Sequence, residues 1–155
     1  MAKALIDTPI GALTVIANDI GVCRVWFGDL EDTASGTEVA DAHLEVALAQ
    51  LNAYFDGERM SFDVAIDRSE RVGFRGEVLG ALETVSFGQT ITYGELAARA
   101  GRPKAARAVG SAMATNPVAI IVPCHRVLPR SGGVGQFGGG VPAKEWLLRR
   151  EGSLD

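Results

Sequence analysis

Residues 92–114 read TYGELAARAGRPKAARAVGSAMA, and this stretch decides the fold of the second half of the chain. Thr92 is a good helix N-cap, and Glu95 three residues later completes a capping box, so the pattern predicts a helix over residues 93–100. A glycine and a proline then break the chain, and a second helix is predicted from about residue 104 to residue 114. Two short helices joined by such a turn form the helix-turn-helix pattern, although many helical hairpins never touch DNA.

The second predicted helix consists mostly of small residues. Because the side chains of AARAVGSAMA are small, the backbone of this helix can lie very close to a partner. The partner is either another element of the protein or a narrow groove. Upstream of the pair, Phe74, Val78, Leu79 and Leu82 share one helical face, which predicts a further helix that ends before Phe87.

The first half of the chain predicts a small α/β unit. Two β-rich runs, 11–17 and 22–27, flank a short Asn-Asp break and favour an antiparallel hairpin. Residues 38–55 place apolar side chains at helical spacing, and residues 62–66 alternate as a half-buried strand. Residues 67–73 are charged and lack periodicity, so the domain boundary is expected there.

The expected fold is therefore α/β. A small N-terminal α/β domain, made of an antiparallel sheet plus a helix, is expected over residues 1–67. A mainly helical domain with the helix-turn-helix follows over residues 68–155, since 155 residues are enough for two small cores.

Composition excludes several classes of protein. Hydrophobic residues make up 47% and charged residues 22%, which is typical of a folded globular chain rather than a disordered one. No apolar run reaches the roughly 18 residues that a membrane span needs. The first residues lack the pattern of a secretory signal, and the two cysteines have no zinc-site spacing. We therefore expect a cytoplasmic protein with free thiols, no metal and no cofactor.

The charge of the chain is divided between its halves. Residues 1–67 carry 3 basic and 12 acidic side chains, a net −9, whereas residues 68–155 carry 12 basic and 7 acidic ones, a net +5. Such asymmetry is a hint that the basic half binds a polyanion. The alternative is that the first half simply presents an acidic, solvated face.

The chemistry of the chain centres on residues 120–128, IIVPCHRVL, where one of two cysteines stands beside one of two histidines. Positive neighbours lower a thiol pKa and favour the reactive thiolate, so Cys124 is a candidate nucleophile. The alternative is that Cys124 is an inert packing thiol, since free Cys is among the most buried residue types. Adjacent residues on a strand point to opposite faces, so contact with His125 needs either a local bend or a relaying water. The preceding Pro123 makes an irregular backbone plausible. Cys23, in contrast, is interpreted as an inert packing thiol of a strand.

Val122–Leu128 resembles the active-site signature of the O6-alkylguanine-DNA alkyltransferases, DNA-repair proteins that react once. Four further stretches of the second half resemble family motifs in the family's order and spacing, and two of the first half do so more loosely. These stretches are Thr90–Ala97, Lys104–Gly110, Asn116–Pro117, Lys144–Leu148, Asp7–Gly11 and Trp26–Asp29. The resemblance thus spans nearly the whole chain.

The resemblance implies a role for each catalytic residue. Cys124 would take the alkyl group from O6-alkylguanine, and by the family's chemistry from O4-alkylthymine, and keep it as a thioether. His125 would be the base, working through a water, and Glu145 would orient the imidazole. Asn116 would brace the turn beside the active site. Without the resemblance, Glu145 reads as a solvated helix carboxylate.

The resemblance also implies how double-stranded DNA is bound. The target base must leave the stack before attack, so the helix at 104–114 would enter the minor groove. Arg107 would fill the vacated stack, or alternatively make an ordinary phosphate contact. Tyr93 would press on the target phosphate, or alternatively be partly buried behind its cap. The small or hydroxyl residues expected against the groove are Ala106, Ala108, Gly110 and Ser111.

The base pocket implied by the resemblance is walled by the loop 132–140. Its expected residues are Val122, Pro123, Phe137, Gly138 and Gly139. Phe137 stands where relatives often carry Tyr, and Gly138 where some carry a hydroxyl residue, so two possible hydrogen-bond donors are missing. The resemblance therefore does not determine which O6 adducts are accepted, although the expected reaction stays the same.

The leading hypothesis is a monomeric enzyme that repairs alkylated double-stranded DNA by stoichiometric transfer to its own cysteine, without metal, cofactor or membrane. Two other classes of protein are also compatible with these residues. A lesion sensor would bind the damage and leave the thiol unmodified, and a Cys-His hydrolase would turn over many times on an ester or amide.

Overall fold

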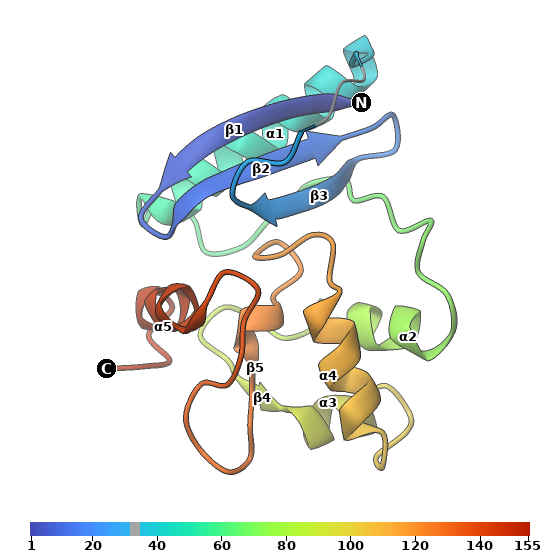
Figure 1. Ribbon diagram of the computed structural model, residues 1–155, viewed down its shortest axis with the longest axis vertical. Helices are drawn as coiled ribbons and strands as arrows, with labels where there is room; N and C mark the ends of the chain where they lie inside the picture. The colour runs from blue at the N-terminus through green and yellow to red at the C-terminus, as the bar shows by residue number, and fades with distance from the viewer. Residues whose placement is uncertain (32–34) are drawn as a thin grey trace. The chain divides into compact units, whose positions relative to one another are not determined.

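The structure is a computed structural model, and it describes residues 1–31 and 35–155. The chain forms two compact units, Met1–Arg68 and Ser69–Asp155 (Figure 1). No helix in the described part of the chain has the length and apolar character needed to cross a membrane.

The first unit is a three-stranded antiparallel sheet covered by one helix. Strands β1 (Ala2–Thr8), β2 (Gly11–Ala17) and β3 (Val22–Phe27) pair in the order β1-β2-β3. Helix α1 (Glu38–Phe55) packs against the sheet (Figure 1), and its apolar stripe is buried there. The predicted hairpin of β2 and β3 and the predicted helix are therefore confirmed.

The predicted strand at residues 62–66 is wrong. Only Ile66 forms a bridge, to Val22. The Gln50 side chain of α1 instead binds the backbone of Asp63 from both sides, with the Asp63 N–H donating to Oε1 at 2.8 Å and Nε2 donating to the Asp63 carbonyl at 2.9 Å. Apart from the bonds of Val22 to the Ala65 carbonyl and to the Asp67 N–H, at 2.8 and 2.9 Å, this segment forms no strand, and the Gln50 side chain binds its backbone at Asp63.

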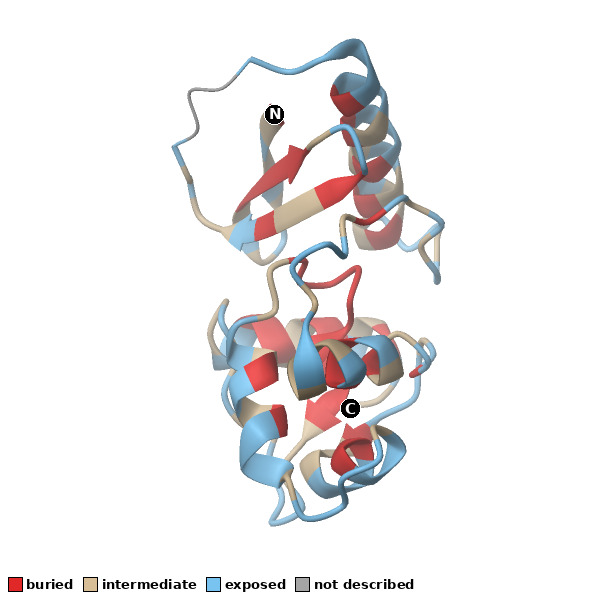
Figure 2. Ribbon diagram, turned by 90° about the vertical axis from the view of Figure 1, so that its right-hand side faces the viewer, coloured by how far each residue is buried: buried red, intermediate tan, exposed pale blue. Residues whose placement is uncertain are grey.

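The second unit is mainly helical and surrounds a two-stranded parallel sheet. Its elements in chain order are α2 (Gly73–Leu82), β4 (Ile91–Thr92), α3 (Tyr93–Arg99), α4 (Ala106–Ala114), a 3₁₀ turn (Cys124–Arg126), β5 (Val127–Leu128) and α5 (Val141–Arg150). Strand β4 pairs with β5, which directly follows the turn that carries Cys124. The inner faces of these elements are buried around this sheet (Figure 2).

The helix-turn-helix is formed by α3 and α4, which pack against each other. The capping box is present, because the Glu95 N–H donates to Thr92 Oγ1 at 3.1 Å and the Thr92 N–H donates to Glu95 Oε1 at 3.2 Å. Helix α4 begins at Ala106 rather than at residue 104, and no side chain caps its start. The predicted fold class, an α/β unit followed by a mainly helical one with a helix-turn-helix, is confirmed.

Candidate functional site

The backbone around Cys124 is irregular, as the neighbouring proline suggested. Pro123 has φ −84° and ψ 65°, and Cys124 then opens a single 3₁₀ turn that ends at Arg126. Four residues before the cysteine, Ile120 has φ 72°, in the left-handed region that is costly for a β-branched residue. The chain is therefore bent on the way to the thiol, which was one of the two expected alternatives.

The Cys124 thiol is buried, with 7% of the residue exposed. Burial raises the pKa of the thiol, whereas a hydrogen bond from the Asn116 side chain and the positive charge of Lys144 act to lower it. Asn116 is itself fixed, because its Nδ2 donates to the Val122 carbonyl at 2.9 Å and its Oδ1 accepts from the Val118 N–H at 3.1 Å. The predicted brace thus sits where α4 leads into the cysteine segment.

The His125 side chain is fully buried and its ring is oriented by a carboxylate. Its Nε2 lies 2.8 Å from Glu151 Oε2. A carboxylate only accepts, so Nε2 carries the proton, and Nδ1 is left as an acceptor without a hydrogen-bond partner among the described residues. Burial lowers the pKa of His125 despite the opposing effect of Glu151. The imidazole is therefore neutral near pH 7 and has a free basic nitrogen.

Glu151 serves two basic side chains at once. Arg126 Nε lies 2.8 Å from Glu151 Oε1 and Arg126 Nη2 lies 3.1 Å from Oε2, which is a bidentate ion pair. Arg126 Nη1 also donates to the Val85 carbonyl at 2.6 Å. The carboxylate that orients His125 is thereby held in place by a buried guanidinium.

The prediction that Glu145 orients the imidazole is wrong. Glu145 pairs with Arg149 at 3.2 Å, one helical turn further along α5, and this pair is partly exposed. The interpretation of Glu145 as a solvated helix carboxylate holds instead. The missed signal was helical periodicity: the buried positions Lys144, Leu147, Leu148 and Glu151 repeat at i, i+3, i+4 and i+7, and Glu145 lies off that face.

Lys144 is a second residue that the sequence analysis missed. It is 1% exposed, and its Nζ donates to the Val127 carbonyl at 2.7 Å and to the Gln136 carbonyl at 3.3 Å. Burial lowers its pKa to about 8, although the nearby Cys124 acts to raise it. Lys144 therefore places positive charge near the thiol and ties the strand after the cysteine to the loop that follows.

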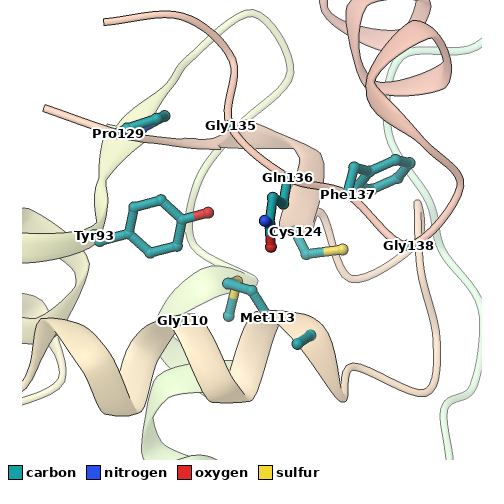
Figure 3. A pocket seen from close by; sticks show the side chains of 10 residues that line it. Tyr93, Gly110, Met113, Cys124, Pro129, Gly135, Gln136, Phe137 and Gly138 are labelled. Carbon is teal, nitrogen blue, oxygen red and sulfur yellow. The ribbon is translucent and has the colours of Figure 1, made fainter. Parts of the chain in front are cut away.

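A pocket of about 500 Å³ opens onto the Cys124 side chain (Figure 3). It is lined by Tyr93, Gly110, Met113, Ala114, Cys124, Pro129, Gly135, Gln136, Phe137 and Gly138. Burial, followed by the charge of Cys124, raises the pKa of Tyr93, so its hydroxyl is neutral at physiological pH. The pocket thus has the nucleophile on one wall, α4 on another and the glycine-rich loop on a third.

The predicted pocket residues divide into two groups. Phe137 and Gly138 line the pocket, whereas Val122, Pro123 and Gly139 are not on its wall. Val122 is fully buried, and its carbonyl receives the Asn116 amide. Val122 and Pro123 lie in the segment that leads directly into the turn of Cys124.

The residues predicted to meet DNA lie on α4 and at the start of α3. Ala106, Arg107, Ala108 and Ser111 are exposed, and Gly110 is half-buried on the pocket wall. Arg107 precedes Gly110 by three residues and therefore shares its helix face. Tyr93 is half-buried at the first position of α3 and faces the pocket (Figure 3). The structure thus brings both helices to the mouth of the cavity that holds the thiol.

Within residues 1–31 and 35–155, no three or more His, Cys, Asp or Glu side chains lie close enough together to bind a metal ion. Cys23 is half-buried, and its Sγ lies 3.5 Å from the Ile16 carbonyl oxygen. It lies in the first unit, whereas Cys124 lies in the second.

The chain is similar to known proteins over both of its units. Residues 1–68 match the family model described as 6-O-methylguanine DNA methyltransferase, ribonuclease-like domain, and residues 73–153 match the one described as 6-O-methylguanine DNA methyltransferase, DNA binding domain. A methylated-DNA--protein-cysteine methyltransferase of Methanosarcina acetivorans is 41% identical over 99% of each chain. The human protein of the same name is 37% identical over 98% of this chain and 81% of its own.

The solved structures give the same answer. The crystal structure of Mycobacterium tuberculosis OGT in complex with DNA superposes with a TM-score of 0.85 at 39% identity and covers 97% of this chain and 93% of that one. Because the two family models together match nearly the whole chain, this chain belongs to the 6-O-methylguanine DNA methyltransferase family.

Proposed function

We propose that this chain repairs DNA directly, by moving the alkyl group of O6-alkylguanine in a duplex onto the sulfur of Cys124. The observation that carries the proposal is the thiol itself. Cys124 lies on the wall of an open pocket, and its neighbour in sequence is a neutral histidine whose ring is held by Glu151. The names of the matching family and relatives support the reaction class. The geometry supports Cys124 as the nucleophile, His125 as the base and Glu151 as the orienting carboxylate.

The chemical step is a displacement at the alkyl carbon. The Cys124 proton passes, through a bridging water, to the free Nδ1 of His125, and the sulfur attacks the carbon. The C–O6 bond breaks as the C–S bond forms, and its electron pair leaves with guanine, which takes a proton back. The sulfur keeps the alkyl group as a thioether, so each molecule of protein reacts once. Lys144 favours the thiolate, because its positive charge lowers the thiol pKa.

The roles of the DNA-facing residues are part of the same proposal. Helix α4 enters the minor groove, Arg107 fills the space left by the extruded nucleotide, and Tyr93 presses on the target phosphate. The support is placement: α4 has an exposed face of small residues that contains Arg107 and continues into the pocket wall at Gly110. The M. tuberculosis relative is described as a complex with DNA.

The proposal extends to the domains, the oligomeric state, the location and a second substrate. Residues 1–67 and 68–155 act as separate domains, and the chemistry belongs to the second. The protein works as a monomer and in the cytoplasm. O4-alkylthymine is accepted as a second substrate through the same displacement.

Mass spectrometry of the protein after incubation with a duplex containing O6-methylguanine tests the proposal. The Cys124 peptide should gain the mass of one methyl group, the Cys23 peptide of the same sample should stay unmodified, and Cys124→Ser should gain nothing. Tight binding to the damaged duplex with an unmodified Cys124 would identify a lesion sensor instead. Many products per protein molecule on an ester or amide would identify a hydrolase. Either result refutes the transfer reaction.

A further inference from the structure

The pocket beside Cys124 is poor in polar side chains. Seven of its ten lining residues offer no strong hydrogen-bonding side chain, because they are Gly, Ala, Pro, Phe or Met. The remaining three are the nucleophile itself, Tyr93 and Gln136. A small number of placed polar groups in an apolar pocket normally fixes the orientation and identity of a ligand. The two side chains that remain for this task are therefore Tyr93 and Gln136.

The backbone of Gln136 is held in place from two sides. Its carbonyl oxygen accepts a hydrogen bond from the buried Lys144 Nζ at 3.3 Å. Gly135 before it has φ 76°, and a Cβ added there would lie 3.0 Å from Pro129 Cγ, so the chain packs closely at this point. The position from which the Gln136 side chain leaves the loop is thus fixed by the fold.

The side-chain amide of Gln136 has no hydrogen-bond partner in the described part of the protein. Figure 3 shows it pointing into the pocket, between the Tyr93 ring and the Cys124 side chain in this view. A carboxamide offers both an NH₂ donor and a carbonyl acceptor. Gln136 is an exposed residue, so its amide is free to bond a ligand that enters the pocket. An amide without a protein partner beside a nucleophile is suited to read the edge of the molecule that the nucleophile attacks.

The edge of O6-alkylguanine is complementary to such an amide. Alkylation at O6 removes the proton from N1, so N1 becomes an acceptor, while the 2-amino group beside it remains a donor. An NH₂ group can then donate to N1 while the carbonyl oxygen of the same amide accepts from the 2-amino group. In O4-alkylthymine the corresponding atoms, N3 and O2, both accept, so a carboxamide makes one bond instead of two.

We infer that Gln136 determines base specificity by bonding the N1 and 2-amino edge of the alkylated guanine, and that it favours O6-alkylguanine over O4-alkylthymine. This inference rests on the proposed function and adds the atoms that are recognised. It also explains how a pocket with Phe137 and Gly138, neither of which has a hydroxyl, retains a polar contact to the base. A site built to bond a substrate N–H discriminates strongly against an analogue that lacks it.

Two small substrates isolate the contact. O6-Benzylguanine and 6-(benzyloxy)purine have the same leaving group, and the second lacks only the 2-amino group. Both are free bases, so neither needs to be extruded from a duplex. The variant is Gln136→Met, which keeps the length of the side chain and removes the amide. Ser131→Ala, on the same loop but not on the pocket wall, is the matched control. The rate of Cys124 benzylation is measured for each pair.

Gln136→Met should slow O6-benzylguanine about tenfold more than it slows 6-(benzyloxy)purine, because only the first substrate loses the 2-amino contact. Ser131→Ala should match the wild type on both. Equal slowing of the two substrates, or no slowing of either, would overturn the inference while leaving alkyl transfer intact. A wild-type protein that reacts with neither base nor with an alkylated duplex would instead refute the proposed function.

A duplex measurement completes the test. In competition between O6-methylguanine and O4-methylthymine duplexes, the wild type should prefer guanine, and Gln136→Met should reduce this preference about tenfold. An unchanged preference would show that the amide does not read the base.

Discussion

His125 Nε2 and Glu151 Oε2 lie 2.8 Å apart in a fully buried contact, although the two residues are 26 positions apart in sequence. This contact fixes the tautomer of the imidazole and leaves Nδ1 as the free basic atom. The orienting carboxylate of the site therefore comes from the end of α5, where Glu151 follows the last helical residue, and not from its middle.

Glu151→Gln and Glu145→Gln distinguish the two carboxylates of this region. Glu151→Gln should slow benzylation of Cys124 by O6-benzylguanine about a hundredfold, since the base loses its orientation and electrostatic support. Glu145→Gln should react like the wild type, because Glu145 only pairs with the exposed Arg149. Similar losses in both variants would contradict the assignment.

The same change carries a cost in stability that must be measured separately. Glu151→Gln leaves the buried Arg126 without its anionic partner, and removing one member of a buried pair costs about 3–5 kcal/mol. The rates are therefore compared at a temperature where circular dichroism shows both variants to be folded.

Lys144→Met tests the charge next to the thiol. Lys144 acts to lower the pKa of Cys124, so the variant should react more slowly at neutral pH and recover part of the loss as the pH rises. The measurement is the pH dependence of O6-benzylguanine reactivity. Lys104→Met, which removes an exposed lysine, is the control. A loss that is the same at every pH would show that Lys144 only holds the Gln136 loop.

Arg107→Ala should weaken repair of a duplex much more than reaction with free O6-benzylguanine. The proposed role of Arg107 is to extrude the base, and the free base needs no extrusion. Arg149→Ala removes an exposed arginine from α5 and should change neither rate. The ratio of the two rates is the readout, and an equal loss on both substrates would exclude the role in extrusion.

Gly110→Ala separates the stability of α4 from its function. A Cβ at Gly110 meets no other atom within 4 Å, so the change should stabilise the helix by about 0.5–1 kcal/mol. The added methyl group nevertheless lies on the face that is proposed to approach the DNA backbone, so repair of the duplex should slow. Urea unfolding and single-turnover repair are measured on the same preparation. A more stable protein with unchanged duplex repair would show that α4 does not come close to DNA.

The pKa of His125 is held below its ordinary value by burial, and this predicts a loss of stability in acid. The unfolded chain binds a proton at this histidine below about pH 6.5, whereas the folded protein resists it. The unfolded state therefore holds more protons as the pH falls below that value, and the free energy of unfolding decreases.

His125→Gln can still donate to Glu151 and does not titrate, so it is the matched control for this effect. Urea unfolding at about pH 7 and about pH 5 should show a larger decrease for the wild type than for the variant. Equal decreases would assign the acid sensitivity to other groups.

The sequence by itself determined the local structure of the second unit. The capping box of Thr92 and Glu95 predicted the start of α3, because the two residues satisfy each other's backbone over three positions. The predicted strand at 62–66 was wrong: apart from the bridge of Ile66 to Val22, the backbone there is bound at Asp63 by the side chain of Gln50 from α1. Short-range hydrogen bonds can be read from neighbouring residues, whereas this contact depends on how α1 is placed.

The nucleophile and its base were also visible in the sequence, since Cys124 and His125 are adjacent. Only the tertiary structure decided which carboxylate joins them. Glu145 and Glu151 are both glutamates in the region of α5, and the sequence alone does not say which one contacts His125. Glu151 does, because it lies on the side of α5 that packs inward and is buried there. Lys144 and Gln136 also belong to the site through the tertiary structure. The fold buries Lys144 near the thiol, and it places Gln136 on the wall of a pocket that Tyr93 and α4 also line.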